Sequence, residues 1–158
     1  MALPKMDLPK IAILAFAGCV ALASSAGAPR ADLLSRTGDV IAIMGGELFV
    51  GQAEGHYGGA GTLAIHAQQN PAVTCTGEFT SSAALGGKGQ LRCSDGAAAT
   101  FRFDRLSMMR GHGDGTFTRG PMSFTYGLSA EDSRPYLKLP AGKRLAYNGT
   151  TLELVPSP

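Results

Sequence analysis

The chain has no tryptophan, only three cysteines and little charge, with 14 basic and 12 acidic residues among 158. A net charge of +2, without a basic stripe interleaved with aromatic residues, argues against a nucleic-acid partner. Beyond residue 23 only Cys75 and Cys93 remain, and two cysteines cannot by themselves form a structural zinc site. In an oxidising compartment this pair predicts a disulfide.

The chain also lacks an apolar run long enough for a membrane helix, which needs about 20 residues. Its one uncharged apolar run, residues 11–23, follows Lys5 and Lys10 and ends in Ala21-Leu22-Ala23, which fits an A-x-A cleavage site. These features are the parts of a secretory signal peptide. We therefore predict a signal over residues 1–23, a linker over 24–38 and a folded domain over 39–158.

A second interpretation of the leader depends on Cys19. Residues 16–19, Phe-Ala-Gly-Cys, resemble a bacterial lipobox, whose cysteine is lipidated and becomes the new N-terminus. The leader would then end before Cys19, and the protein would contact a membrane through a lipid anchor. Both interpretations predict export.

The rest of the chain lacks a sustained 3.6-residue apolar period, which argues against long helices. Short runs of β-branched and aromatic residues alternate instead with turn-forming residues, which indicates strands. Gly45-Gly46 and Asn148-Gly149 each lie between two such runs and predict two-residue hairpin turns. A serine followed by two acidic residues predicts one short helix near residues 129–136.

A Gly-x-Gly motif followed by an apolar residue recurs at Gly59, Gly87 and Gly113. Each copy precedes a strand-like run, at residues 74–79, 100–103 and 123–126. The repeat predicts antiparallel strands in series.

Residues that face each other across a hairpin have numbers with a constant sum, so each turn predicts a register. If Cys75 faces Cys93, then Phe79 faces Gly89. A three-residue turn over 94–96 then places Gly89 opposite Phe101 on the next strand. An aromatic ring over a strand glycine shields bare backbone and fills the empty space.

The third hairpin predicts the same arrangement, because a turn over 119–120 places Gly115 opposite Phe124 and Gly113 opposite Tyr126. We therefore assign these rings and glycines a structural role. The predicted fold is all-β: a single antiparallel, strongly twisted meander or small barrel of about 8–9 strands with one short helix.

The three histidines, His56, His66 and His112, are the candidate metal ligands. A metal site would need them to converge with a carboxylate such as Asp114. Their spacing does not enforce this, so we interpret them as exposed loop residues and predict no cofactor.

The sequence gives little support for a catalytic site. A hydrolase triad could use Ser94, His112 and Asp104, but no serine lies in a Gly-x-Ser-x-Gly motif. Glu78 and Asp104 could form a carboxylate pair for glycoside cleavage, although strand acids usually mark the solvent face. The Gly-x-Gly motifs lead into strands rather than helices, which excludes a helix-based phosphate loop. Three apolar residues lie close together at Leu106 and at 108–109, Met-Met. They predict either an exposed apolar loop that binds a partner or an ordinary cap on the end of the sheet.

The motifs of residues 59–127 resemble a group of uncharacterised small exported proteins and lipoproteins of proteobacteria. The resemblance rests on Gly-x-Gly, on Cys-Ser-Asp-Gly at 93–96, on Phe-x-Phe at 101–103 and on Phe-x-Tyr-Gly at 124–127. It implies a β-sheet domain in the periplasm or cell envelope of a Gram-negative bacterium. Residues 77–89 are also similar to MORN repeats, which are glycine-and-aromatic hairpins in series.

The sequence therefore predicts a non-enzymatic envelope protein, acting as a structural module or binding a protein, glycan or lipid. Two alternatives stay open: a small secreted hydrolase or metal-binding enzyme, and an accessory subunit of an envelope complex. A deep polar pocket joining two or more histidines would favour the enzyme.

Overall fold

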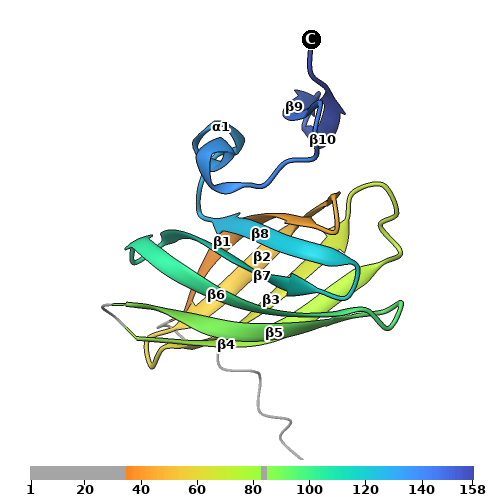
Figure 1. Ribbon diagram of the computed structural model, residues 1–158. Coiled ribbons are helices and arrows are strands. Elements are labelled where there is room, and N and C mark those ends of the chain that lie inside the picture. The colour runs from red at the N-terminus through yellow and green to blue at the C-terminus, as the bar shows by residue number, and fades with distance from the viewer. Residues whose placement is uncertain (1–34, 83–84) are drawn as a thin grey trace, which may run out of the picture. The chain divides into compact units, whose positions relative to one another are not determined.

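The computed structural model describes residues 35–82 and 85–158, and they form an all-β protein (Figure 1). The predicted signal peptide and Cys19 lie outside these residues, as does the predicted linker up to residue 34. The linker's last residues, 35–38, belong to the first strand, which already begins at Ser35.

Eight antiparallel strands follow one another around a closed barrel, and β1 pairs with β8 to complete it. The strands are β1 (Ser35–Met44), β2 (Glu47–His56), β3 (Ala60–Ala67), β4 (Thr74–Ser82), β5 (Gly86–Cys93), β6 (Ala98–Ser107), β7 (Arg110–Phe117) and β8 (Gly120–Tyr126). After β8 come the short helix α1 (Ala130–Ser133), the 3-10 turn η1 (Arg134–Tyr136) and a separate hairpin of β9 (Lys143–Asn148) and β10 (Thr151–Pro156). The predicted all-β fold with one short helix is confirmed.

The first turns follow their predicted registers. Gly45 and Gly46 have φ angles of 59° and 84° and connect β1 to β2, because a two-residue turn needs this left-handed backbone. Across the next hairpins, Gly89 pairs with Phe79 on one side and with Phe101 on the other.

The predicted register of β7 and β8 is wrong by two residues. Phe117 pairs with Gly120, so Gly113 faces Phe124 and Gly111, rather than Gly113, faces Tyr126. The predicted turn over 119–120 would need a backbone N–H at residue 121 to close it, and Pro121 has none.

The last hairpin turns one residue later than predicted. Asn148 pairs with Thr151, so the turn residues are Gly149 and Thr150 rather than Asn148 and Gly149. Gly149 takes the left-handed φ of 62° at the first turn position, so Asn148 stays in the strand.

The segment after β8 covers one outer strip of the barrel. Ile41, Ile43 and Leu48 point outward from β1 and β2 and are buried in one cluster with Leu145 and Leu152 of the hairpin. Ala130 and Leu137 complete this cluster. Its burial explains why the outer face of β1 is as apolar as the inner face.

Polar contacts hold the same segment on β8. The Ser129 hydroxyl caps α1 by accepting from the Asp132 amide, as predicted. Ser133 and Thr125 are fully buried, and their hydroxyl oxygens lie 2.8 Å apart. Among the described residues, no helix has both the length and the apolar character needed to cross a membrane.

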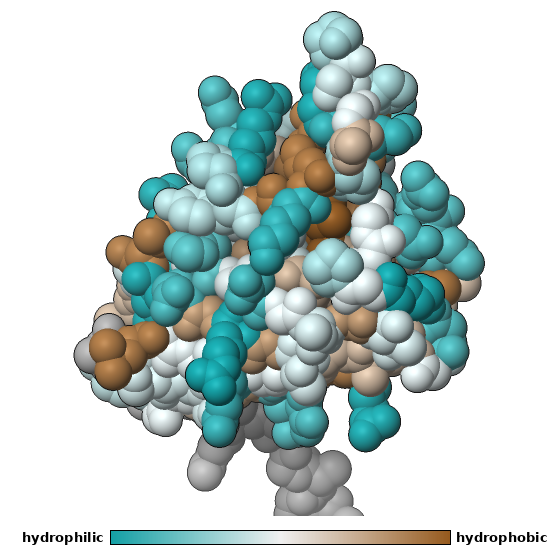
Figure 2. Space-filling view, viewed as in Figure 1, coloured by the Kyte–Doolittle hydropathy of each residue, from teal (hydrophilic) through white to brown (hydrophobic). Residues whose placement is uncertain are grey.

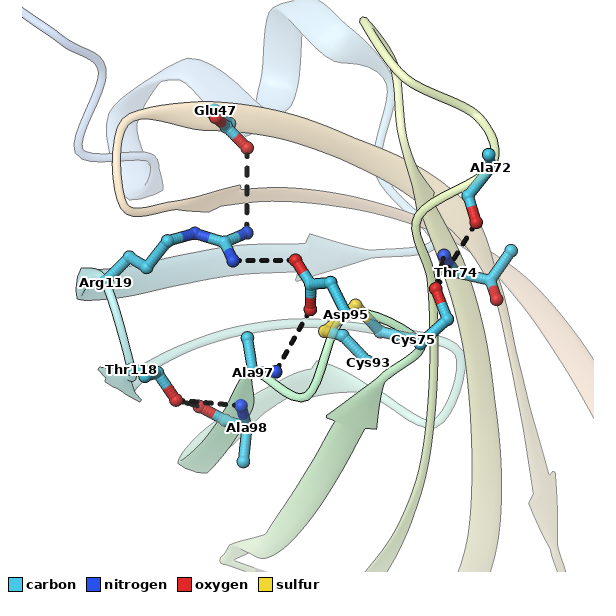
Figure 3. The surroundings of a disulfide bond; sticks show 11 residues. Glu47, Ala72, Thr74, Cys75, Cys93, Asp95, Ala97, Ala98, Thr118 and Arg119 are labelled. Atoms are coloured by element: carbon cyan, nitrogen blue, oxygen red, sulfur yellow. Dashed lines mark hydrogen bonds and ion pairs between the residues drawn. A yellow bond between two sulfur atoms is a disulfide. The ribbon is translucent and has the colours of Figure 1, made fainter.

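One end of the barrel carries the predicted disulfide and is filled by buried side chains (Figure 3). Cys75 and Cys93 are direct cross-strand partners with Cα atoms 3.9 Å apart. Phe49 and Phe117 pack edge-to-face beside this end, with ring centroids 6.2 Å apart. We call this end, with the β1–β2, β3–β4, β5–β6 and β7–β8 turns, the closed end.

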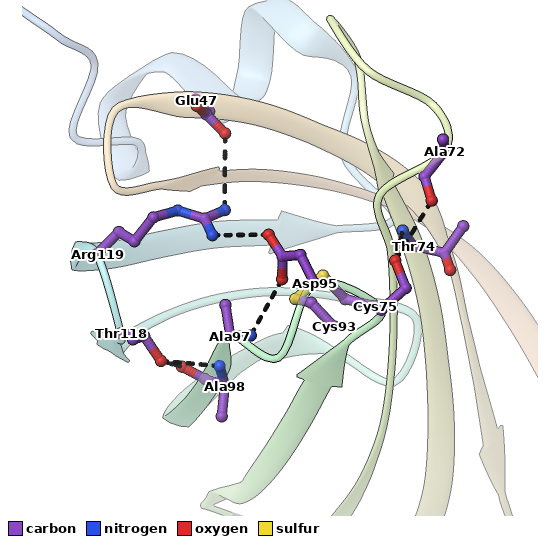
Figure 4. Close-up of polar contacts among 11 residues, drawn as sticks. Glu47, Ala72, Thr74, Cys75, Cys93, Asp95, Ala97, Ala98, Thr118 and Arg119 are labelled. Atoms are coloured by element: carbon purple, nitrogen blue, oxygen red, sulfur yellow. Dashed lines mark hydrogen bonds and ion pairs between the residues drawn. A yellow bond between two sulfur atoms is a disulfide. The ribbon is translucent and has the colours of Figure 1, made fainter.

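Polar contacts connect the turns of the closed end to one another (Figure 4). Arg119 bonds Asp95 at 2.7 Å and lies 4.8 Å above the Phe117 ring. Its hydrogen bond to Asp95 holds the pKa of that carboxyl below the usual value, helped by the Ala97 amide. These groups are solvent-exposed, so each ion pair contributes little to stability.

Candidate ligand-binding cavity

Five aromatic side chains point into the barrel, and each ring lies over a glycine of the preceding strand. Phe79 covers Gly61, Phe101 covers Gly89, Phe103 covers Gly87, Phe124 covers Gly113 and Tyr126 covers Gly111. A Cβ added at these glycines would collide with the ring, for example at 2.6 Å from Cζ of Phe124 for Gly113. The arrangement therefore requires glycine at these positions.

Ring-over-glycine packing is observed, but of the four predicted rings only Phe101 keeps its predicted glycine. Phe79 pairs with Gly89 in register, but its ring lies on Gly61 of β3. Gly115 faces Met122 on β8, and a Cβ there would instead meet the backbone of Phe101. All five rings lean the same way around the barrel.

The tilted rings form an aromatic wall on β4, β6 and β8. Phe79 and Phe103 meet edge-to-face at 5.6 Å between centroids, and Phe101 and Phe124 meet at 5.1 Å. Phe103 and Tyr126 meet at 5.8 Å with nearly perpendicular planes. Such contacts fix the ring orientations, because the positive ring edge meets the negative face.

The opposite wall has small side chains, and a cavity of about 540 Å³ lies between the two walls. Gly38, Ala53 and Gly55 face this space from β1 and β2, with Leu63 and Ile65 from β3. A volume of this size lies within the range typical of small-molecule sites. Eight-stranded barrels have room for either side chains or one small ligand.

The cavity opens at the end opposite the disulfide, which we call the open end. Its rim comprises residues 57–59, 82 and 108–109 from three connections. Leu106 and Met108 are 50% and 66% exposed, and Tyr57 and Leu85 are still more exposed. Figure 2 shows hydrophobic surface at the left edge, where the β6–β7 turn lies in Figure 1. The predicted apolar loop therefore borders the mouth of the cavity.

A few polar groups enter this apolar space. The Arg105 guanidinium donates from Nη2 to the Ser81 hydroxyl, which in turn bonds the Gly59 carbonyl oxygen at 3.1 Å. Arg105 thereby spans from β6 to β4. Tyr126 also lines the cavity, and burial raises the pKa of its phenol, an effect that the positive charge of Arg105 opposes and Asp104 reinforces. The phenol is therefore protonated at neutral pH.

The three histidines do not converge, and the prediction that they are exposed loop residues is wrong, because all three lie on strands and are partly buried. His56 ends β2 beside the cavity, whereas His66 pairs with Val50 near the opposite end of that strand. His112 lies on the outer face of β7 and stacks on Tyr136 at 4.1 Å. Across residues 35–82 and 85–158, no three His, Cys, Asp or Glu side chains are grouped as a metal site would require.

The proposed catalytic sets are also separated. Asp104 pairs with His112 on the outer face, but Ser94 lies in the β5–β6 turn, about 20 Å away along β6. The Ser94 hydroxyl instead lies within hydrogen-bond distance of the Thr74 amide and the Ala72 carbonyl. Glu78 is exposed on the outer face of β4.

Sequence reasoning missed Arg105 as a cavity residue, although a signal was present. Phe101 and Phe103 alternate on the inner face of β6, and the same period of two places Arg105 on that face. An arginine that points into a barrel is expected either to pair with a buried acceptor or to contribute to a binding site.

Comparison with known proteins adds no further assignment: no family model, curated protein or solved structure matches the chain significantly.

Proposed function

We propose that this protein is an exported, non-enzymatic binding protein of the cell envelope whose barrel holds one small apolar or amphipathic molecule. The cavity of about 540 Å³ carries this proposal, because its walls are aromatic and aliphatic while the opposite end of the barrel is closed. Of the expected ligand classes, protein, glycan and lipid, an apolar interior of this size favours a lipid-like molecule.

Two further observations support the proposal. The Cys75–Cys93 disulfide agrees with an oxidising compartment, where such bonds persist. The cavity is lined by one histidine, His56, rather than by the two or three that the enzyme alternative calls for.

The test is binding of N-phenyl-1-naphthylamine, a neutral dye that fluoresces in apolar surroundings. We expect saturable binding to the wild-type barrel. Ala53→Trp places an indole in the cavity from β2 and is expected to weaken dye binding at least tenfold.

The matched control is Ala64→Trp, because Ala64 is an exposed neighbour on β3 that faces outward. It is expected to bind the dye within twofold of wild type. Urea melts of both variants establish that they are folded. Equal dye binding by a folded Ala53→Trp variant and by wild type would place the dye elsewhere and refute the cavity as the site.

A further inference from the structure

The charged side chains that line the cavity are both arginines, while Asp104 lies next to Arg105 on the outer face of β6. Arg36 and Arg105 both line it, whereas no aspartate or glutamate does. None of the ion pairs found among the described residues includes either arginine. Arg36 is exposed, but Arg105 is half-buried, and a guanidinium beside apolar rings without a counter-ion is unfavourable because such surroundings solvate charge poorly. An anionic ligand would supply the missing partner.

Two polar atoms at this site are buried without a hydrogen-bond partner within the described part of the chain. They are Nε of Arg105 and Oη of Tyr126. Both can donate a hydrogen bond, since arginine keeps its protons and the phenol is neutral. Buried donors of this kind are rare in folded proteins, and each calls for an acceptor such as a water molecule, an ion or a ligand group.

The two side chains belong to one row across the sheet. Gly111 on β7 is the register partner of Arg105 on β6 and of Tyr126 on β8. All three positions face the interior. A Cβ at Gly111 would lie 2.5 Å from the Tyr126 ring, so this glycine lets the tyrosine lean toward Arg105.

Arg36 extends this positive region toward the mouth. It faces inward on β1, four residues before Val40, which is the register partner of Tyr126. Below this row, the Phe101, Phe103 and Phe124 rings line the deeper cavity. The site therefore has donors near its mouth and an apolar wall beneath them.

We propose that the ligand is an amphipathic anion, with an oxyanion head group bound by Arg105 and Tyr126 and an apolar chain against the phenylalanine wall. This inference rests on the proposed function and specifies its ligand class. Nε of Arg105 and Oη of Tyr126 have almost no accessible surface, so the head group reaches them when the side chains at the mouth shift. Met108 lines the mouth and is 66% exposed, and exposed side chains change rotamer on the picosecond-to-nanosecond timescale.

The experiment measures displacement of N-phenyl-1-naphthylamine by dodecanoate, dodecyl phosphate and dodecanol, each below its micelle concentration. Arg105→Met is expected to weaken binding of the anions about tenfold or more, the usual effect of losing a charge-assisted hydrogen bond. Dodecanol binding and dye binding are expected to change by less than twofold. Tyr126→Phe removes one oxygen atom and is expected to weaken the anions severalfold, which keeps the test valid if Arg105→Met does not fold.

Arg102→Met is the matched control, because Arg102 lies on the same strand but is exposed on the outer face. It is expected to leave all three affinities unchanged. A loss shared by both anions supports a general oxyanion site, and a loss confined to one identifies the head group.

Two results overturn the inference in distinguishable ways. If the anions lose no more affinity than dodecanol in both cavity variants, the head-group site is refuted while the apolar cavity stands. If wild type binds neither dye nor dodecanol nor the anions, the proposed function fails and the inference fails with it.

Discussion

Glycine is the residue that shapes the interior of this barrel. A strand glycine ordinarily weakens a sheet, because it offers no side chain to pack. Here the missing side chain is the space into which a ring from the next strand leans, as Phe101 does on Gly89. The rings thus lie flat against the wall rather than filling the centre, and this leaves room for the cavity.

Gly89→Val is expected to destabilise the protein by about 1–3 kcal/mol, the range for overpacking. A side chain at this position would collide with the Phe101 ring and with the Glu78 carbonyl. Lys88→Val, on the exposed face of the same strand, is expected to stay within about 0.5 kcal/mol of wild type. Urea melts of the oxidised proteins measure both, and equal midpoints would contradict the ring-over-glycine packing.

The C-terminal hairpin depends on the barrel for its stability. Two strands alone are marginal in water, so β9 and β10 need an apolar surface to cover. The outward Ile41, Ile43 and Leu48 provide it, and Leu145 is only 2% exposed in that cluster. The hairpin therefore acts as an outer cover of β1 and β2.

Leu145→Ala is expected to cost on the order of 2 kcal/mol or more in unfolding free energy, as for other buried leucines. Tyr147→Ala is the control, because Tyr147 lies two residues further along β9 and is 62% exposed. Its melt is expected to shift by less than about 0.5 kcal/mol. A Leu145→Ala melt that coincides with the control would indicate that the hairpin contributes nothing to barrel stability.

The two ends of the barrel differ in their contacts: those at the closed end stabilise the fold, whereas the open end contains the proposed binding cavity. The closed end holds the disulfide, the Phe49–Phe117 contact and the Arg119 network. The open end has the cavity, the unpaired donors and most of the exposed large apolar residues. Rigid closure at one end allows the other to keep an unfilled interior.

The double variant Cys75→Ala/Cys93→Ala is expected to lose about 3 kcal/mol of stability, since the bond closes a loop with a sequence separation of 18. Its affinity for N-phenyl-1-naphthylamine is expected to stay within twofold of wild type at low temperature. Urea melts and dye titrations of the same preparation test both values. Loss of dye binding by the folded variant would mean that the two ends are coupled.

Local patterns in the sequence determined most of the strand order and several registers. A disulfide between Cys75 and Cys93, combined with side-chain alternation, was enough to pair Phe79 with Gly89, and the short turn over 94–96 then paired Gly89 with Phe101. The same reasoning gives the wrong register at the β7–β8 turn, because Pro121 lacks the N–H that a turn over 119–120 would need. That error could have been avoided from the sequence alone.

Closure of the barrel and the cavity within it were decided only by the tertiary structure. Pairing of β1 with β8 joins residues 78 to 86 positions apart, from Met44 with Met122 to Val40 with Tyr126, and no single turn connects them. The lean of each ring depends on the twist of the closed sheet, so the sequence could not show that Phe79 covers Gly61 rather than Gly89. Arg105 and Tyr126 flank Gly111 through the registers of the β6–β7 and β7–β8 hairpins, but only the closed sheet directs both side chains into one interior cavity.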